Sequence, residues 1–180
     1  MTPPNSNNQR IAIISDTHGV IDKNIIDVIK SCDQVLHAGD ICGGHILDQL
    51  NSILPDVTAV AGNNDASGLW PVDQTHIVNS LPQIAEIRLP GGILVMEHGH
   101  RHGMQQPCHA SLRKTHSHAR AIVYGHTHSM VVDKNESPWV INPGAAGQTR
   151  TRGGPSCLVL TANEKEWDIQ MIRFPVEQVA

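Results

Sequence analysis

The first half of the chain alternates short apolar runs with amphipathic segments. The run 11–15 is typical of a buried parallel strand, and Ile25, Ile26 and Ile29 share one face of a helix expected within 22–32. Two more strands are expected at 34–40 and 56–65, with an amphipathic helix at 43–54 between them. Strand–helix–strand repeats with short connections predict a parallel sheet with right-handed crossovers.

The second half is rich in short β segments. Three of them are separated by Leu-Pro and Pro-Gly-Gly turn signals, a helix is expected at 107–119, and five further strands follow it. The expected β segments are 74–80, 83–89, 92–99, 121–126, 129–134, 139–144, 157–162 and 167–174. Helices in the first half of the chain and strands in the second half predict an α/β fold in which two sheets pack face to face between helices. We expect one domain at 11–180, after a flexible lead-in at 1–10.

Composition narrows the class of protein. The chain has 180 residues, 39% hydrophobic and 17% charged, which suits one folded domain with a substantial core. A net charge of -4 and an aromatic content of 3% argue against general nucleic-acid binding. The apolar runs are too short to span a membrane, and the N-terminus lacks a secretory pattern. The four cysteines form no C-x-x-C pair, so we expect free thiols in a cytoplasmic protein.

Residues with metal-ligand chemistry follow the ends of the expected strands. Each motif alone has an ordinary interpretation, such as a helix N-cap, a turn or a surface loop. In open α/β sheets, however, ligands bind beyond the C-terminal ends of the strands. Carboxylate, imidazole and amide oxygen without thiolate suit Mn²⁺, Fe or Zn²⁺. The candidate ligands are Asp16, His18, Asp40, Asn63, His98, His126 and His128.

His126 and His128 stand two residues apart at the end of the strand expected from 121. Positions i and i+2 of a strand point to the same side of a sheet. The pair therefore suits either two neighbouring metal ions or one ion held twice.

In chain order, the motifs D-x-H, G-D, G-N-x-D, H-G and G-H-x-H resemble the calcineurin-like metallophosphoesterase superfamily. The segments HGH and INPGAAGQTR resemble its small YfcE-like phosphodiesterase branch, and the resemblance spans residues 11 to 173. It implies an αββα sandwich of two mixed β-sheets flanked by helices, with two divalent ions. The implied ligands are Asp16, His18, Asp40 and His128 for one ion, and Asp40, Asn63, His98 and His126 for the other. Asp40 would then bridge the ions, and Asp40, Asn63 and His98 would be catalytic.

The implied reaction is hydrolysis of a phosphate ester by a hydroxide that bridges the two ions, with a phosphodiester as the first expectation. Manganese is the expected metal, with iron, zinc and nickel as alternatives. The expected substrate is a small phosphodiester or nucleotide-like molecule, and family members form homodimers or homotetramers. Two alternatives stay open: a phosphomonoesterase or nucleotide hydrolase, and a non-catalytic metal-binding scaffold for protein interactions with the same fold.

Asn64 departs from the larger family, many of whose members have at this position a histidine thought to protonate the leaving group. An amide does not transfer a proton near pH 7, so we expect a preference for substrates with good leaving groups. We expect Asn64, His100 and Arg150 beside the substrate and Asp65 behind a metal ligand. Solvated loop side chains and a turn aspartate are the alternatives. Other histidines, His37 and His116 among them, are expected to be structural or exposed.

Overall fold

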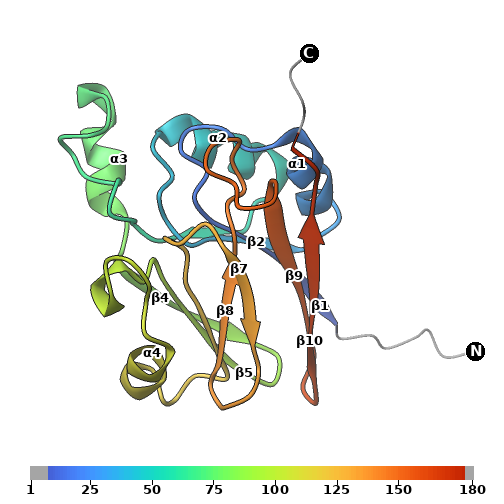
Figure 1. Cartoon of the computed structure of the whole chain (residues 1–180). Coiled ribbons are helices and arrows are strands. Elements are labelled where there is room, and N and C mark those ends of the chain that lie inside the picture. Colours follow the sequence, from blue (N-terminus) through green and yellow to red (C-terminus); the bar gives the residue numbers. More distant parts are fainter. Residues whose placement is uncertain (1–7, 177–180) are drawn as a thin grey trace, which may run out of the picture.

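Two five-stranded β-sheets form the centre of the computed structural model, which describes residues 8–176 (Figure 1). The first sheet has the order β10-β9-β1-β2-β3 and the second has the order β4-β5-β6-β8-β7. Both are mixed, because β1 pairs in parallel with β2 and antiparallel with β9, while β5 pairs in parallel with β6 and antiparallel with β4. The strands are β1 (Gln9–Ile14), β2 (Gln34–His37), β3 (Val57–Ala59), β4 (Ile84–Leu89), β5 (Gly92–Glu97), β6 (Ala121–Val123), β7 (Met130–Asp133), β8 (Trp139–Pro143), β9 (Ser156–Ala162) and β10 (Trp167–Arg173).

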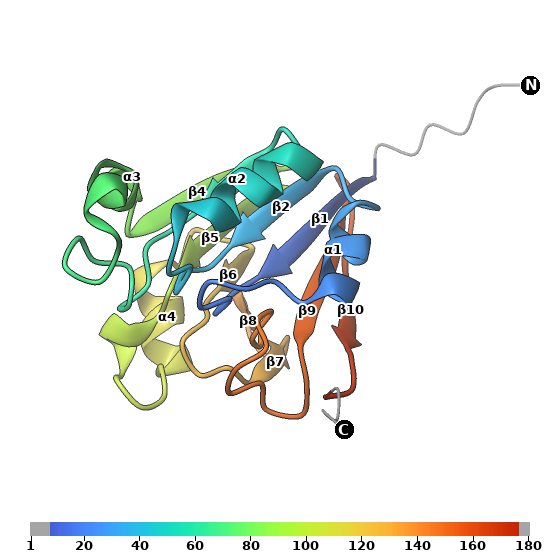
Figure 2. The same ribbon diagram turned by 90° about the horizontal axis from the view of Figure 1, so that it is seen from above.

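Short helices cover the outer faces of both sheets. They are α1 (Lys23–Ile29), α2 (Gly44–Ile53), α3 (Thr75–Ser80) and α4 (His109–Thr115), with 3-10 turns η1 (Val72–Gln74) and η2 (His100–His102). Figure 2 shows α1 and α2 lying over the first sheet. Leu112 of α4 packs with Val95 and Ile122 on the outer face of the second sheet. The predicted αββα sandwich is confirmed.

The alternation of side chains along β1 explains the layers. Ile11 and Ile13 point into the core between the sheets, where they join Leu94 and Met96 of β5. Ala12 and Ile14 point the other way and pack beneath α1 and α2. Since successive strand residues face opposite sides, this continuously apolar strand is buried on both faces. The first sheet therefore has helices on one face and the second sheet on the other.

The expectation of a β segment at 74–80 is wrong, because these residues form the end of η1 and the helix α3. Val78 is buried, and Ile77 and Leu81 pack beside it against the cluster under α2. The spacing of 77, 78 and 81 matches one face of a helix. The run was too short for its alternation to distinguish the two structures.

The N-terminal end of the described chain forms part of the first sheet. β1 begins at Gln9, which pairs with Ala162, so residues 9 and 10 belong to the first sheet. Residues 1–7 of the expected flexible lead-in lie outside the described residues.

All four cysteines are free thiols. Within residues 8–176, no helix has both the length and the apolar character needed to cross a membrane.

Candidate metal centre

The candidate ligands lie in five loops that leave neighbouring strand ends. Asp16 and His18 follow β1, Asp40 follows β2, and Asn63 lies in the loop after β3. In the second sheet, His98 follows β5, while His126 and His128 follow β6. The backbone N–H of Asp16 donates to the Gly39 carbonyl and that of His18 donates to the Asp40 carbonyl, both at 3.0 Å. These bonds fasten the β1 loop to the β2 loop.

A left-handed backbone conformation marks these loops. Non-glycine residues rarely adopt positive φ, and strained backbone clusters at functional sites. Seven non-glycine residues among the described ones have it, and five of the seven are candidate ligands. The five are Asp16, His18, Asp40, His126 and His128. The backbone conformations that set the directions of these side chains are therefore held by the surrounding structure.

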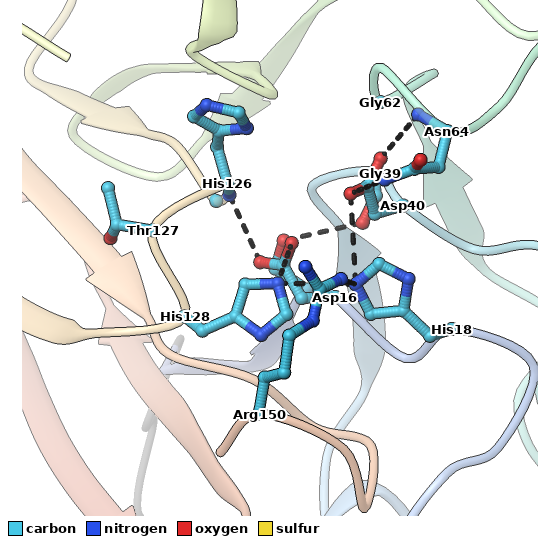
Figure 3. A network of polar contacts seen from close by, with 12 residues as sticks. Asp16, His18, Gly39, Asp40, Gly62, Asn64, His126, Thr127, His128 and Arg150 are labelled. Atoms are coloured by element: carbon cyan, nitrogen blue, oxygen red, sulfur yellow. Dashed lines mark hydrogen bonds and ion pairs between the residues drawn. The ribbon is translucent and has the colours of Figure 1, made fainter. Parts of the chain in front are cut away.

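Asp16, His18, Asp40 and His128 form one compact group, as Figure 3 shows. Each offers one ligand atom, and these atoms lie within 4.8 Å of one another. Nε2 of His128 lies 3.3 Å from Oδ1 of Asp16, and Nε2 of His18 lies 3.8 Å from Oδ2 of Asp40. The structure thus brings together all four residues predicted for the first ion.

Four buried atoms in this region have no hydrogen-bond partner among the described residues. They are Oδ1 of Asp16, Nε2 of His98, Nδ1 of His100 and Nδ1 of His128. Buried polar atoms are nearly always satisfied, and an exception needs an explanation such as an ion. Nδ1 of His98 bonds the Ala38 carbonyl at 2.8 Å, which leaves Nε2 facing the centre. A carboxylate oxygen and an oriented imidazole without partners are donors that fit a divalent cation.

The residues predicted for the second ion are assembled less closely. Nε2 of His98 lies 3.4 Å from Oδ1 of Asp40. His126 instead faces Asn63, with Nδ1 and Oδ1 2.8 Å apart, and its Nε2 donates to the Met104 carbonyl at 2.7 Å. In Figure 3 the His126 ring points away from Asp16 and Asp40. The structure therefore places His98 beside Asp40, while Asn63 and His126 face each other. The His126 ring meets the His98 ring edge-on, with their centroids 5.3 Å apart.

Burial and close charges shift the pKa values in the centre. Burial raises the pKa of Asp16 to about 7. Burial would also raise the pKa of Asp40, but His98 and the donors of Asn64 outweigh it and hold that pKa well below its usual range. The carboxylates of Asp40 and Asp16 raise the pKa of His98 despite its burial. These contacts thus favour the ionised form of Asp40 and the protonated form of His98.

The other two imidazoles shift in the opposite direction. Burial lowers the pKa of His18, and burial followed by the charge of Arg150 lowers that of His128 to about 4. Neutral imidazole is the form that binds a metal ion. His18 and His128 are therefore ready to act as ligands near neutral pH.

Asp65 and Asn64 hold the Asp40 loop from two sides. Asp65 is buried and accepts hydrogen bonds from the backbone N–H groups of Ile41, Cys42 and Gly62 at 2.8 to 3.1 Å. Asn64 donates its backbone N–H to Oδ1 of Asp40 at 2.8 Å and its side-chain amide to Oδ2 at 2.7 Å. Asp65 thus lies behind the loop of Asp40, and the amide of Asn64 is engaged with Asp40.

His100 and Arg150 lie at the edge of the centre. The His100 ring centroid lies 5.6 Å from that of His98 and 6.1 Å from that of His126, and its Nδ1 has no partner among the described residues. The exposed Arg150 places its guanidinium 3.0 Å from Nε2 of His18. Figure 3 shows this side chain lying against His18 and His128. Both residues therefore border the ligand group.

Two further buried residues shape the loops. The sequence led us to expect His37 only as structural or exposed, and it did not single out Asn142. Nδ1 of His37 accepts from the Gly39 N–H at 3.2 Å, so its Nε2–H donates to Oγ1 of Thr17 at 2.9 Å. Burial lowers the pKa of His37 to about 4, which keeps it neutral. The amide of Asn142 donates to the Gly125 carbonyl at 2.7 Å and thereby holds the loop of His126 and His128. The only sequence signal was a polar residue at the end of an apolar strand.

A pocket of about 160 Å³ opens beside the β6 loop. Its lining is mainly polar, and Thr127 and Ser129 flank His128 in the chain. The residues that line it are Gln105, Gln106, Tyr124, Thr127, Ser129, Val131 and Arg152.

A two-sheet sandwich with a carboxylate–imidazole group at its strand ends defines a class of metal-binding α/β proteins. The family model of the calcineurin-like phosphoesterase superfamily domain matches residues 10–165. The chain belongs to this superfamily, as its motifs predicted.

Relatives from archaea and a eukaryote cover nearly the whole chain. A probable metallophosphoesterase of Methanothermobacter thermautotrophicus is 29% identical over 91% of both chains. A phosphodiesterase of Methanocaldococcus jannaschii is 24% identical over 88% of this chain and 96% of its own length. The crystal structure of Vps29 with Zn²⁺ from Entamoeba histolytica has a TM-score of 0.70 at 18% identity, over 93% of this chain and 99% of that one. This last likeness shows a shared fold.

Proposed function

We propose that the chain is a phosphodiesterase that uses two divalent metal ions. The position of Asp40 carries this proposal. Its Oδ2 faces His18 of the compact group at 3.8 Å, while its Oδ1 faces His98 at 3.4 Å. A carboxylate whose two oxygens point to different sets of imidazoles is suited to bridge two ions.

Two bound ions would supply a Lewis acid for the phosphate oxygens and a water made acidic enough to react near neutral pH. The chain's residues would hold and orient them. His98 keeps Nε2 toward the centre through its bond to Ala38, and Asn64 fixes both oxygens of Asp40. His126 and Asn63 face each other, and the His126 ring centroid lies 5.3 Å from that of His98. Asp40, Asn63 and His98 are the residues to which we assign catalytic roles.

The surroundings of the centre suggest how the substrate binds. Arg150 lies over the His18 side and suits a phosphate oxygen, because guanidinium binds phosphate through charge-assisted hydrogen bonds. The pocket beside Thr127 and Ser129, which Arg152 also lines, suits one polar substituent of a diester. A diester has two substituents where a monoester has one, so a recess beside the centre that takes one substituent would favour the diester.

The choice of metal follows from the donor set. Carboxylate and imidazole without thiolate favour Mn²⁺, with Fe, Zn²⁺ and Ni²⁺ as alternatives. We also propose that the protein is cytoplasmic and that it assembles into a homodimer or homotetramer.

The test is hydrolysis of bis-p-nitrophenyl phosphate by chelator-treated protein before and after Mn²⁺ is restored. Asp40→Asn keeps the size of the side chain and removes its charge, so metal content and turnover should both fall to background. Asp48→Asn, on the exposed face of α2, is the matched control and should behave as wild type. An Asp40→Asn protein with full activity and undiminished metal would refute the bridging role.

The same assay separates the alternatives. A phosphomonoesterase would hydrolyse p-nitrophenyl phosphate far faster than the diester under the same metal. A scaffold with the Vps29-like fold would bind metal and turn over neither substrate. Either result would end the phosphodiesterase proposal.

A further inference from the structure

A second group of potential ligands lies outside the centre described above. Glu97, His102 and His116 each offer one ligand atom, and the three atoms lie within 4.8 Å of one another. Glu97 ends β5, His102 ends η2, and His116 directly follows α4. Glu97 and the neighbouring ligand His98 are successive residues at a strand end, so their side chains leave on opposite sides. Three separate elements thus converge on the side of β5 that α4 covers.

The contacts in this group centre on one carboxylate oxygen. Nε2 of His116 lies 2.7 Å and Nε2 of His102 lies 2.9 Å from Oε1 of Glu97. Glu97 is 1% exposed and His116 5%, so the carboxylate is almost wholly removed from water. A buried carboxylate needs compensating positive charge. The half-exposed Arg101 reaches only the other oxygen, Oε2, at 3.6 Å.

The ring of His102 is oriented as in many metal sites. Its Nδ1 lies 2.8 Å from Oγ of Ser111 in α4. Histidine ligands usually donate their second ring N–H to an oxygen, which fixes the ring and leaves the other nitrogen for the metal. With Nδ1–H donating to Ser111, Nε2 of His102, which faces Oε1 of Glu97, carries the lone pair that would bind an ion.

We propose that Glu97, His102 and His116 bind one zinc ion. Two imidazoles and one glutamate, with a fourth position left to water, form an established zinc ligand set. Tetrahedral bonds of about 2.0–2.1 Å separate ligand atoms by about 3.3 Å. The imidazoles would therefore retreat from Oε1 by roughly 0.5 Å to admit the ion. The double positive charge would neutralise Glu97 without requiring a proton on either histidine.

The ion would stabilise one wall of the metal centre. The segment 99–116 contains His100 and Met104, whose carbonyl accepts from Nε2 of His126. Glu97 anchors the start of this segment and His116 its end. Zinc would pin both ends to β5. The zinc proposal does not rest on the proposed phosphodiesterase activity, because none of its three ligands belongs to the centre of Asp16, His18, Asp40 and His128.

The decisive experiment is a crystal structure of the full chain, grown with free zinc buffered in the micromolar range and measured on both sides of the zinc absorption edge. We expect an anomalous peak within bonding distance of Glu97 Oε1 and both Nε2 atoms. Peaks confined to the group of Asp16, His18, Asp40 and His128, or a peak beside Glu97 that needs millimolar free zinc, would overturn the proposal. In either case the contacts with His102, His116 and Arg101 would be the only compensation for Glu97 among the described residues.

Zinc content in solution provides the second test. His116→Gln should hold one zinc fewer per chain than wild type after dialysis against the same buffered zinc. Ser111→Ala, which removes only the orienting hydroxyl, should weaken binding at this site by about 10- to 100-fold. His118→Gln is the matched control, because His118 makes a similar 2.8 Å contact with Glu86 on the surface and has no third ligand. Equal zinc content in all four proteins would contradict the site, and the crystal decides if His116→Gln does not fold.

Discussion

Gly62 packs its backbone directly against the side chain of Asp40. A Cβ atom on Gly62 would collide with Oδ1 and the backbone nitrogen of Asp40 and would lie 2.9 Å from its Cγ. The loops after β2 and β3 therefore meet without any side chain between them. This close approach lets Asn64, two residues further on, reach both oxygens of the same carboxylate.

Gly62→Ala should displace Asp40 and weaken metal binding. The added methyl group meets backbone and a carboxylate that two hydrogen bonds hold in place, so neither can move cheaply. We expect a fall in metal affinity and at least a tenfold fall in diesterase activity. Isothermal titration with Mn²⁺ and the bis-p-nitrophenyl phosphate assay measure the two effects. Gly68→Ala is the control, because nothing lies within 4 Å of the added atom.

Asp65→Asn should destabilise the whole ligand loop. Asp65 accepts from three backbone N–H groups and from the indole N–H of Trp70 at 3.2 Å. The amide N–H₂ of asparagine would face at least one of these donors and leave it unsatisfied. Charged hydrogen bonds and buried orphan donors are each worth about 1–3 kcal/mol, so unfolding should need roughly 2–4 kcal/mol less free energy. Urea unfolding measures the loss, and an unchanged midpoint would contradict this role of Asp65.

His37 should make the stability of the metal-free protein depend on pH. Its pKa falls from 6.5 in the unfolded chain to about 4 in the fold, because burial disfavours the charged ring. The unfolded chain therefore binds the extra proton first as the pH falls. The contribution of His37 is complete above pH 6.5 and is lost as the pH falls toward 4, a change of about 3 kcal/mol.

Urea unfolding with chelator present, at several pH values between 7 and 4, tests this dependence. The free energy of unfolding of wild type should fall with acidification by about 3 kcal/mol more than that of His37→Gln. Glutamine retains an N–H donor for Thr17 and does not titrate. Parallel curves for the two proteins would show that His37 is not the group responsible.

The sequence predicted the fold and the strand-end positions of the candidate ligands, because both depend on local signals. The apolar strands at 11–15 and 121–123 end in Asp16 and His126, and the strand ends of a sheet fall on one edge. The sequence could not reveal the residues that hold the ligand loops in place, because their roles depend on tertiary contacts. The bond from His37 to Thr17 joins two loops, and Asn142 holds a loop seventeen residues before it. The expectation of a β segment at 74–80 was wrong for the same reason, because tertiary packing under α2 decides that this segment is helical.

Asn64→His should change which substrates the centre prefers. In wild type no proton donor stands at position 64, because the amide of Asn64 is engaged with Asp40. Leaving groups that need protonation should therefore react slowly, and a p-nitrophenyl diester should be hydrolysed far faster than an alkyl diester. A histidine there would supply general-acid help, which is worth about 10²–10⁴-fold to a poor leaving group and little to nitrophenolate. The ratio of kcat/KM for the two diesters should thus narrow at least tenfold in Asn64→His and stay wide in Asn64→Gln. Similar rates on both diesters in wild type would contradict this prediction. Another group, for which His100 beside His98 is the candidate, would then protonate the leaving group.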